Sequence, residues 1–550
     1  MFLIKQKDLF VICSDDYSSS VSERYRIDTD SGFNEKNFMG YCFQDNKLFH
    51  ELYKEVPDIS ALEDTYYYNC GVFCSIIIEK VTRIFTDPMG QYPVFYFNKG
   101  GSFIVSNNFF AISSLLKEKK MNLDCMIDYV TYLSPLKQET ILQDVYRLSS
   151  FETLKIENNS LKKVENNNYL LDFSYDELLK IVADRMKSRA KALLDRSSPL
   201  CHLTGGGDSR LAFSSLLANG FKGNVFSYGD GNSEDRLICH SLAKRYDLTE
   251  GVLNKFDAHI NDLKKYVHMV MAFNSIKSSH FSNWGSGVDT KYSEVTGYFG
   301  ETLKGFGSIY IKKGWMPKET NYHSFYRKNS NFDDKLFDLA ESRVLEDLSR
   351  QQIFKKPLLN NILFYLRNRC SSHFGMHSVV SNRNFVSVDL DYEPLFLSLV
   401  NSCIYDDNEI KAGAITVDLI RLIHSEELAV YPYQGRVVPR YTKWTKKITK
   451  DQQSCFESFK PKKRELQEVI VRNKYIEPDF NFYSLKVQNQ TFSRPGELYK
   501  HPCFSDFYDK YPVFLSALNA ERGDIRFELT SLSSLMVCEM LATKRMYSFI

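Results

Sequence analysis

The chain has 550 residues, of which 43% are hydrophobic and 25% charged, and its formal net charge is +2. This composition is typical of a globular protein with two or three domains, and the near-neutral charge argues against a bulk attraction to nucleic acid or acidic membranes. No apolar run is long enough to cross a bilayer, and residues 1–5 do not begin a secretion signal. We therefore expect a soluble cytoplasmic protein with no nucleic-acid or membrane partner.

The 12 cysteines are scattered along the chain. Cys70 and Cys74 are the closest pair, and no second pair completes a zinc-binding pattern. We expect reduced thiols, many of them buried, as is usual in a reducing compartment.

The first 170 residues predict a domain of short strands. Gly100-Gly101 predicts a hairpin turn, and residues 152–164 alternate in polarity around Asn158-Asn159. The polar run 165–168 predicts a linker that ends the domain near residue 170. Strands are expected over 10–13, 72–78, 94–97 and 103–105, and helices over 109–116 and 126–133.

From Tyr175 onward, helices and strands alternate, which predicts a parallel sheet with right-handed crossovers. Gly220 can end one of these helices, and Ser233 can cap the start of another. The last third of the chain has mostly helical patterns, and the basic stretch 443–463 predicts a solvated segment. The expected elements are a helix over 177–193, a strand over 200–203, a helix over 211–219, a strand over 224–228 and a helix over 234–246.

A glycine-rich loop between a predicted strand and a predicted helix is the best candidate for a binding site. Glycines allow positive φ and close backbone approach, and amides at the start of a helix favour an anion. The hydroxyls of Thr204 and Ser209 can donate hydrogen bonds to phosphate oxygens. Asp208 would repel phosphate unless a magnesium ion lies between its carboxylate and the phosphate. A tight turn with a capping aspartate is the alternative. The loop comprises Leu203, Thr204, Gly205, Gly206, Gly207, Asp208 and Ser209.

This loop lacks the Gly-Lys-Ser/Thr ending of a Walker loop and resembles the S-G-G-x-D-S pyrophosphate-binding loop of the ATP-pyrophosphatase group. Residues 85–96, 104–107 and 145–148 resemble, in order, segments of class II glutamine amidotransferase domains. The glycine loop then lies where asparagine synthetases and β-lactam synthetases carry theirs, and residues 233–237 resemble the start of their next helix. The chain is thus similar to this family over most of its length, and most weakly after residue 440.

The resemblance implies an α+β Ntn-hydrolase-like sandwich over residues 1–170. It implies an adenine nucleotide α-hydrolase-like α/β domain with a parallel sheet, followed by a mostly helical C-terminal part, over residues 171–550. Family members with glutaminase activity carry cysteine at position 2, where this chain has Phe2, and the Asn-Gly-Glu loop that helps to hold glutamine is missing. We expect the first domain to be a structural partner without glutaminase activity. Processing that exposes Cys13 is the alternative, although Cys13 lies inside a predicted strand.

The resemblance also implies roles for residues beyond the glycine loop. Residues 296–303 resemble the S-G-x-G-x-D-E-L loop of the family, which makes Glu301 a magnesium ligand together with Asp208; a surface glutamate in a glycine turn is the alternative. Residues 390–395 resemble the P-F-L-D segment, which we interpret as structural. The remaining nucleotide contacts expected are Arg210, Phe226, Ser227, Tyr228 and Gly297.

Three residues are candidates for the chemistry itself. Tyr298 matches a tyrosine that takes part in deprotonating the attacking amine in β-lactam and carbapenam synthetases; a packed aromatic is the alternative. Lys443 or Arg440 can supply the late cation that stabilises the transition state in the family, and solvated surface charges are the alternative.

These observations predict an ATP- and Mg²⁺-dependent ligase that adenylates a carboxylate, releases pyrophosphate and joins the acyl group to an amine. Its substrates would be a small-molecule or peptide carboxylate and amine, as in formation of a β-lactam-like ring or a lasso-peptide macrolactam. One alternative is ammonia-dependent amidation of a sugar acid or small carboxylate in a surface-polysaccharide or secondary-metabolite pathway. Another is a non-catalytic ATP-binding regulatory protein. A homodimer or a partner enzyme of the same pathway is compatible with each function.

Overall fold

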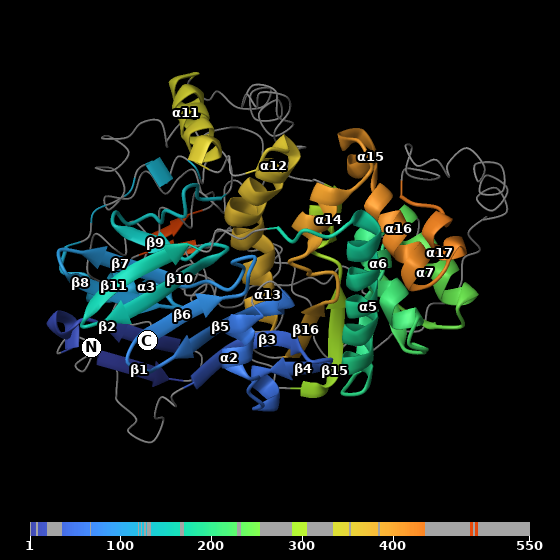
Figure 1. Cartoon of the computed structure of the whole chain (residues 1–550), viewed down its shortest axis with the longest axis horizontal. Coiled ribbons are helices and arrows are strands. Elements are labelled where there is room, and N and C mark those ends of the chain that lie inside the picture. Colours follow the sequence, from blue (N-terminus) through green and yellow to red (C-terminus); the bar gives the residue numbers. More distant parts are fainter. Residues whose placement is uncertain are drawn as a thin grey trace.

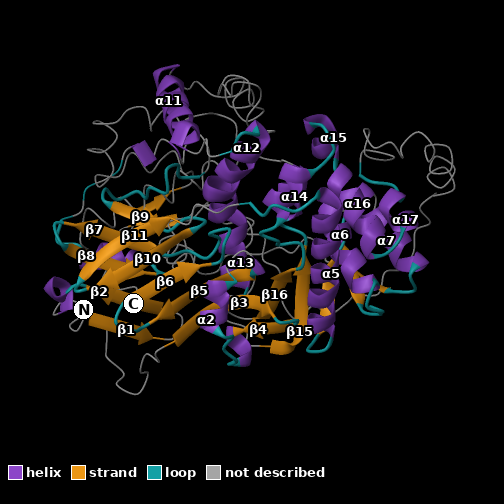
Figure 2. Ribbon diagram, viewed as in Figure 1, coloured by secondary structure: helices purple, strands orange, loops and turns teal. Residues whose placement is uncertain are grey.

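The computed structural model combines antiparallel sheets, a parallel sheet and a set of helices (Figures 1 and 2). The strands of the antiparallel sheets gather on one side of the molecule, and most of the helices lie on the other side or between. The structure describes residues 2–6, 9–18, 36–65, 68–118, 120, 122, 124–125, 128, 134–165, 170–227, 233–252, 289–304, 334–350, 354–382, 385–434, 485–487 and 490–492.

Two antiparallel sheets are formed by the N-terminal part, and buried apolar side chains of both belong to one core. The first has the order β1 (Phe2–Gln6), β2 (Leu9–Cys13), β8 (Ser102–Ser106), β7 (Phe95–Lys99) and β9 (Val145–Arg147). The second has the order β11 (Ser160–Glu165), β10 (Glu152–Glu157), β6 (Thr82–Thr86), β5 (Cys70–Ile77), β3 (Lys36–Gln44) and β4 (Lys47–His50). Two short helices accompany them, α2 (Ile59–Asp64) and α3 (Phe109–Leu115).

The hairpin turn expected at Gly100-Gly101 is present, and a second one occupies Asn158-Asn159, where the alternation in polarity is interrupted. Gly100 and Gly101 join β7 to β8 with φ of 61° and 82°, and Asn158 and Asn159 join β10 to β11 with φ of 49° and 58°. Positive φ at both central residues suits the twist of a two-residue hairpin. The helix expected over 126–133 and the linker over 165–168 fall almost wholly outside the described residues, so both remain predictions.

The parallel sheet predicted for the second part is confirmed. All neighbouring strands in it are parallel. The chain runs outward from β12 to β14, and β15 then returns to the other side of β12. The order is β14 (Thr249–Val252), β13 (Asn224–Ser227), β12 (Ser198–His202), β15 (Asp289–Thr296) and β16 (Phe385–Asp389). The order therefore reverses between β12 and β15, and such a reversal is where ligands bind in sheets of this kind.

Local sequence explains the helices of this part. A capping box of Ser174 and Glu177 starts α5 (Tyr175–Leu194), and the Ser233 hydroxyl caps α7 (Glu234–Arg245), as expected. Gly220, with φ of 75°, follows α6 (Gly207–Leu217). This helix begins four residues before the expected position 211, because its first turn is formed by the end of the glycine loop itself.

The helical character expected of the last third is confirmed over residues 334–430. The described helices there are α11 (Asp334–Arg350), α12 (Pro357–Tyr365), the wider turns of η6 (Leu366–Gly375), α13 (Met376–Ser381), α14 (Phe396–Ser402), α15 (Asp407–Ala412), α16 (Ala414–Ile423) and α17 (Glu426–Val430). A short hairpin of β17 (Leu485–Val487) and β18 (Gln490–Phe492) is also described. Arg440, Lys443 and the basic stretch lie outside the described residues.

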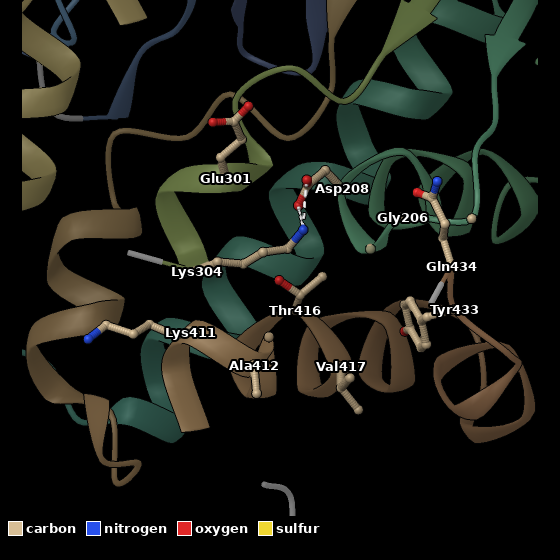
Figure 3. Close-up of a pocket in the computed structure, with 13 residues that line it drawn as sticks. Gly206, Asp208, Glu301, Lys304, Lys411, Ala412, Thr416, Val417, Tyr433 and Gln434 are labelled. Carbon is tan, nitrogen blue, oxygen red and sulfur yellow. Dashed lines mark hydrogen bonds and ion pairs between the residues drawn. The ribbon is translucent and has the colours of Figure 1, made fainter. Parts of the chain in front are cut away.

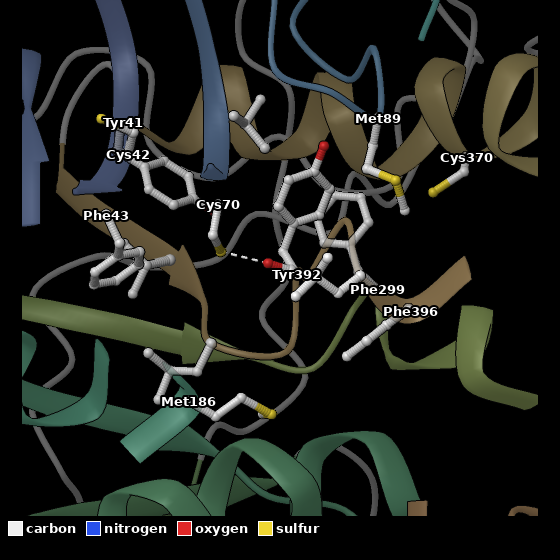
Figure 4. Packing of buried hydrophobic residues seen from close by; sticks show 14 of the residues in the cluster. Tyr41, Cys42, Phe43, Cys70, Met89, Met186, Phe299, Cys370, Tyr392 and Phe396 are labelled. Carbon is white, nitrogen blue, oxygen red and sulfur yellow. Dashed lines mark hydrogen bonds between the residues drawn. The ribbon is translucent and has the colours of Figure 1, made fainter. Parts of the chain in front are cut away.

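Buried contacts join the N-terminal sheets to the segment that follows β16. The Tyr392 hydroxyl donates to Asp87, and its carbonyl accepts from the Cys70 thiol (Figure 4). The Tyr392 ring lies 4.4 Å from that of Phe299 between ring centroids. The core is thus continuous from the antiparallel sheets to the parallel sheet, and the proposed boundary near residue 170 stays a prediction.

Two expectations from composition can be compared with the described residues. The nine cysteines among them are thiols, and eight are buried. Within the same residues, no helix has the combination of length and apolarity that a membrane span needs.

Asp87 should make the stability of the protein depend on pH. Its carboxylate is fully buried and accepts hydrogen bonds from the amides of Gln91 and Tyr92 and from Tyr392. Burial raises its pKa from 3.8 to about 6, although these donors oppose the rise. The folded protein therefore holds this proton more tightly than the unfolded chain does. The resulting stabilisation is complete below about pH 4 and is lost as the pH rises through about 6.

We expect the free energy of unfolding to fall by about 2–3 kcal/mol between pH 4 and pH 7 because of Asp87. Urea unfolding at each pH measures this change. Asp87→Asn should remove that part of the pH dependence while lowering stability at every pH, because an amide cannot accept from all the donors. Asp45→Asn, an exposed change between β3 and β4, is the control. A pH profile of Asp87→Asn parallel to that of the wild type would contradict this assignment.

Candidate functional site

The candidate site lies where the order of the parallel sheet reverses. The glycine loop follows β12, and residues 297–304 follow its neighbour β15. Since parallel strands end at the same edge of a sheet, the two loops meet there. The amide of Leu203 donates to the carbonyl of Phe226 at 2.8 Å and so extends the pairing of β12 with β13 into the loop.

Hydrogen bonds within the glycine loop hold its shape. The Thr204 amide donates to Ser209 Oγ at 3.0 Å, the two hydroxyls lie 2.9 Å apart, and the Gly206 amide donates to Thr204 Oγ1 at 3.1 Å. Asp235, in the first turn of α7, accepts from the Gly205 amide at 2.7 Å. The two hydroxyls expected to face phosphate are therefore bonded to each other here, and Asp235 is a structural partner that the sequence analysis missed.

Close approach, not positive φ, explains most of the glycines of this site. A Cβ atom at Gly297 would lie 2.5 Å from the Ser209 nitrogen and 2.6 Å from the Asp208 carbonyl carbon. A Cβ atom at Gly205 would lie 2.8 Å from the Cβ of Gln434. No real Cβ tolerates such contacts with backbone, so the loops can pack this closely only because they lack side chains.

These loops line a cavity of about 270 Å³ (Figure 3). Its other walls are the junction of α15 with α16 and the short segment after α17. The side chain of Thr416, in the first turn of α16, is 2% exposed, and its hydroxyl has no hydrogen-bond partner among the described residues. The lining residues are Gly205, Gly206, Gly207, Asp208, Glu301, Lys304, Lys411, Ala412, Gly413, Thr416, Val417, Tyr433 and Gln434.

Lys304 neutralises Asp208 inside this cavity. Its ammonium lies 2.6 Å from Asp208 Oδ1 and 2.7 Å from Oδ2, and the hydrogen bond goes to Oδ2. Lys304 ends η4 (Gly300–Lys304), the same 3₁₀ turn that carries Glu301. In Figure 3 the lysine reaches across the cavity to Asp208. Lys304 is not part of the motif that was recognised in the sequence, although its spacing of three from Glu301 places both on one face of such a turn.

Glu301 faces a different partner. Its carboxylate points away from Asp208 (Figure 3), and its Oε2 accepts from the Tyr365 hydroxyl at 2.6 Å. Burial raises the pKa of Glu301 to about 7, and the charge of Asp208 adds to this rise, while Tyr365 and Lys304 oppose it. Glu301 is half-buried and lines the cavity, so it is less solvated than the alternative of a surface glutamate expects, and its role as a metal ligand stays a prediction.

The donor set suits magnesium in its chemistry, because hard carboxylate oxygens from both loops line one cavity. Within the described ranges, however, no group of three or more His, Cys, Asp or Glu side chains is arranged to hold a metal ion as it stands. Asp208 and Glu301 would each have to exchange a present partner, Lys304 or Tyr365, for the metal.

The other described residues that were predicted for the site are not among those that line the cavity. The Tyr298 ring stacks on Phe374 with centroids 5.1 Å apart and meets His377 edge-on, as expected of a packed aromatic. The buried ring of Phe226 stacks on His202, and the Ser227 hydroxyl is buried without a hydrogen-bond partner among the described residues. Tyr228, like Arg440 and Lys443, falls outside the described ranges.

Arg210 is fully buried and positions residues 431–434, the wall of the cavity that adjoins the glycine loop through the hydrogen bond from the Gln434 amide to the Gly205 carbonyl at 2.9 Å. Its guanidinium donates to the carbonyls of Tyr431 and Pro432, each at 2.6 Å, and lies 3.8 Å from the centroid of the Tyr433 ring. A guanidinium that binds two carbonyls and stacks on an aromatic face holds a segment firmly. Its side chain therefore orders residues 431–434 and does not line the cavity, which differs from the nucleotide contact expected.

The comparisons with known proteins do not identify a family. No protein-family model matches the chain, and no curated protein matches its sequence. One similar solved structure is glutamine phosphoribosylpyrophosphate amidotransferase from B. subtilis complexed with ADP and GMP, with 9% identity, a TM-score of 0.15 and coverage of 56% of this chain and 60% of that chain. Another is the allosteric regulatory enzyme of purine biosynthesis, with 9% identity, a TM-score of 0.15 and coverage of 48% and 58%.

The chain thus spans about 60% of the length of the first of these proteins. A TM-score of 0.15 is too low to indicate a shared fold. The architecture described above therefore rests on its own strand order and pairing.

Replacement of Arg210 by lysine should loosen the wall at 431–434. Lysine keeps the charge but cannot bind two carbonyls and stack on Tyr433 at once. We expect a loss of about 2–4 kcal/mol in the free energy of unfolding and faster amide hydrogen exchange in residues 429–434. Arg245→Lys is the matched control, since Arg245 also lies over Tyr431 but is partly exposed. Equal exchange in the two variants would show that Arg210 does not order this wall.

Proposed function

We propose that the chain is an ATP-dependent carbon–nitrogen ligase that forms AMP and pyrophosphate. The observation that carries this proposal is the meeting of the glycine loop with the Gly297–Glu301 loop at the reversal of strand order, around one cavity lined by Asp208, Glu301 and Lys304. The start of α6 favours an anion there, and Lys304 adds a positive charge. Pyrophosphate is the ligand that this combination fits best.

The proposed reaction has two steps. A carboxylate oxygen of the substrate attacks the α-phosphorus of ATP, the bond from that phosphorus to the β-phosphate oxygen breaks, and pyrophosphate leaves. An amine nitrogen then attacks the acyl carbon, the bond to the AMP oxygen breaks, and the amine gives its proton to a base. Magnesium, which Asp208 and Glu301 would hold, neutralises phosphate charge when it is bound. Tyr298 for the base and Lys443 or Arg440 for the late cation remain proposals.

The amine should not come from glutamine. Residue 2 is Phe2, and it pairs with Cys13 within the hydrogen-bonded ladder of β1 and β2. Cys13 is buried, and burial raises the pKa of its thiol to about 12, so almost no thiolate is present at neutral pH. We therefore propose an amine from the substrate itself, as in macrolactam or β-lactam ring formation. Free ammonia is the alternative, for amidation of a sugar acid or other small carboxylate.

A second candidate function has one observation in its favour. The ion pair between Lys304 and Asp208 leaves the cavity without an open metal site. A protein that binds ATP for regulation and does not cleave it could keep such a pair. Release of pyrophosphate from ATP distinguishes the ligase from the regulatory protein.

Pyrophosphate release tests the ligase. The full chain is incubated with ATP and Mg²⁺ and a panel of carboxylates, each alone, with amines, with ammonia and with glutamine. We expect release that depends on the carboxylate, and no stimulation by glutamine. Asp208→Asn should lower the rate by about 100-fold or more while the fold survives, because it removes a charge from the cavity. Asp176→Asn, an exposed change in the first turn of α5, is the matched control.

The contrary outcomes are distinct. ATP binding without release of pyrophosphate for any carboxylate would favour the regulatory protein. Stimulation by glutamine would show that the N-terminal domain is active after all. Product formed only with ammonia would favour amidation over ring formation.

A further inference from the structure

A third carboxylate lies at the same edge of the sheet, on the strand beside β15. Asp391 follows β16, which pairs in parallel with β15. Three strand ends, those of β12, β15 and β16, thus lead to Asp208, Glu301 and Asp391. The segment of Asp391 was interpreted as structural from the sequence.

Asp391 is buried without a partner. Its side chain is 0% exposed, and neither carboxylate oxygen accepts a hydrogen bond from any other described residue. Its neighbour Asp389 differs, because it accepts from the Thr296 hydroxyl and from the Tyr298 amide. A buried carboxylate without donors is expensive, so such a group needs a cation or a proton.

Gly300 shows where Asp391 points. A Cβ atom at Gly300 would lie 2.6 Å from Asp391 Oδ2 and 3.0 Å from Asp208 Oδ1. Two carboxylate oxygens therefore converge on the small volume that a side chain at position 300 would fill. Carboxylate oxygens that converge in this way repel each other unless a cation or a proton lies between them.

Lys304 is the cation present in this arrangement, and it is committed to Asp208. Its positive charge also acts on Glu301 and on Asp391. Glu301 is also within the field of Arg369, whereas Lys304 is the cation that acts on Asp208 and Asp391. Asp208 and Asp391 would together carry two negative charges, which a divalent cation in the place of Lys304 would balance, and carboxylate oxygens are the ligands that Mg²⁺ and Mn²⁺ prefer.

We propose that Asp391 is a ligand of a divalent cation that it shares with Asp208, and that the Lys304 ammonium occupies the cation's place in the metal-free protein. This inference rests on the proposed function only in placing a divalent cation at Asp208. When the cation enters, Lys304 is released toward the glycine loop, since its Cε lies only 3.6 Å from the position of a Cβ at Gly207. There it can bind a phosphate oxygen.

Binding of Mn²⁺ to the full chain tests the site without any turnover. Bound and free Mn²⁺ are distinguished by electron paramagnetic resonance, first without nucleotide and then with a non-hydrolysable ATP analogue. We expect Asp391→Asn to weaken Mn²⁺ binding by about tenfold or more, as loss of a carboxylate ligand does. Asp389→Asn is the matched control: it is equally buried and two residues away, but hydrogen-bonded, and it should change Mn²⁺ affinity far less.

Thermal unfolding gives a second readout, in which the two variants should change the Tm in opposite directions. Asp391→Asn should raise the Tm of the metal-free protein, because an unpaired buried charge is removed, and should abolish the further rise that Mn²⁺ causes in the wild type. Asp389→Asn should lower the Tm and keep the Mn²⁺ effect. Equal Mn²⁺ affinity of Asp391→Asn and the wild type would overturn the proposal, and so would a lower Tm of metal-free Asp391→Asn with its Mn²⁺ effect retained.

Lys304→Met tests whether the Lys304 ammonium occupies the place of the divalent cation in the metal-free protein. Removal of the competing ammonium should tighten Mn²⁺ binding without nucleotide, by about tenfold. In the presence of the ATP analogue the gain should shrink, because the variant lacks a cation for the phosphate. Weaker Mn²⁺ binding by Lys304→Met without nucleotide would contradict the exchange. The chain could bind Mn²⁺ through Asp391 and yet release no pyrophosphate. That result would contradict the proposed ligase function and support the metal site.

Discussion

The cavity depends on one close contact, the packing of the backbone after β15 against the peptide that joins Asp208 to Ser209. No side chain fits between them at Gly297, and a side chain at Gly300 would meet those of Asp208 and Asp391. The contact exists because β12 and β15 are neighbours in the parallel sheet although they lie far apart in the chain. Everything that gives the cavity its chemistry follows from it: Glu301 and Lys304 reach the cavity only through this loop, and Asp391 meets Asp208 only across Gly300.

Charge is distributed unevenly around this contact. Acids are contributed by three strand ends, whereas Lys304 is the cation paired with Asp208. The three carboxylates differ in their partners. Asp208 pairs with Lys304, Glu301 accepts a hydrogen bond from Tyr365, and Asp391 has no hydrogen-bond partner among the described residues. Such a set is poorly balanced by itself, which is expected of a site that receives a charged ligand and not of one that stabilises a fold.

Features set by neighbouring residues could be predicted from the sequence. The turn at Gly100-Gly101, the Ser233 cap and the glycine loop each depend on a few adjacent residues, and the structure contains all of them. The early start of α6 was missed because apolar periodicity begins only after the glycines that form its first turn. Thus local patterns located the loop but not the full extent of the helix behind it.

Features set by contacts between distant segments could not be predicted. Nothing near Lys304 in the sequence indicates that it faces Asp208, and Asp391 is notable only because its donors are missing in three dimensions. Arg210 was expected at a nucleotide because it adjoins the loop, yet the helix turns it inward onto Tyr431 and Pro432. In each case the partner comes from an element whose position the sequence pattern does not specify.

The N-terminal sheets help to hold the segment that carries Asp391. Residues 389–393 are held from the N-terminal side: the Asp389 amide donates to the Tyr41 hydroxyl at 3.1 Å, and Tyr392 bonds to Asp87 and Cys70. From the other side, Glu393 pairs with Arg185 and Arg189 of α5. Asp391 lies in the middle of this segment, and its side chain faces Gly300. A segment fixed at both ends can keep an unpaired carboxylate buried where a looser one would turn it toward water. The antiparallel sheets, without a nucleophile at position 2, thus still contribute to the site by fixing the strand end that presents Asp391.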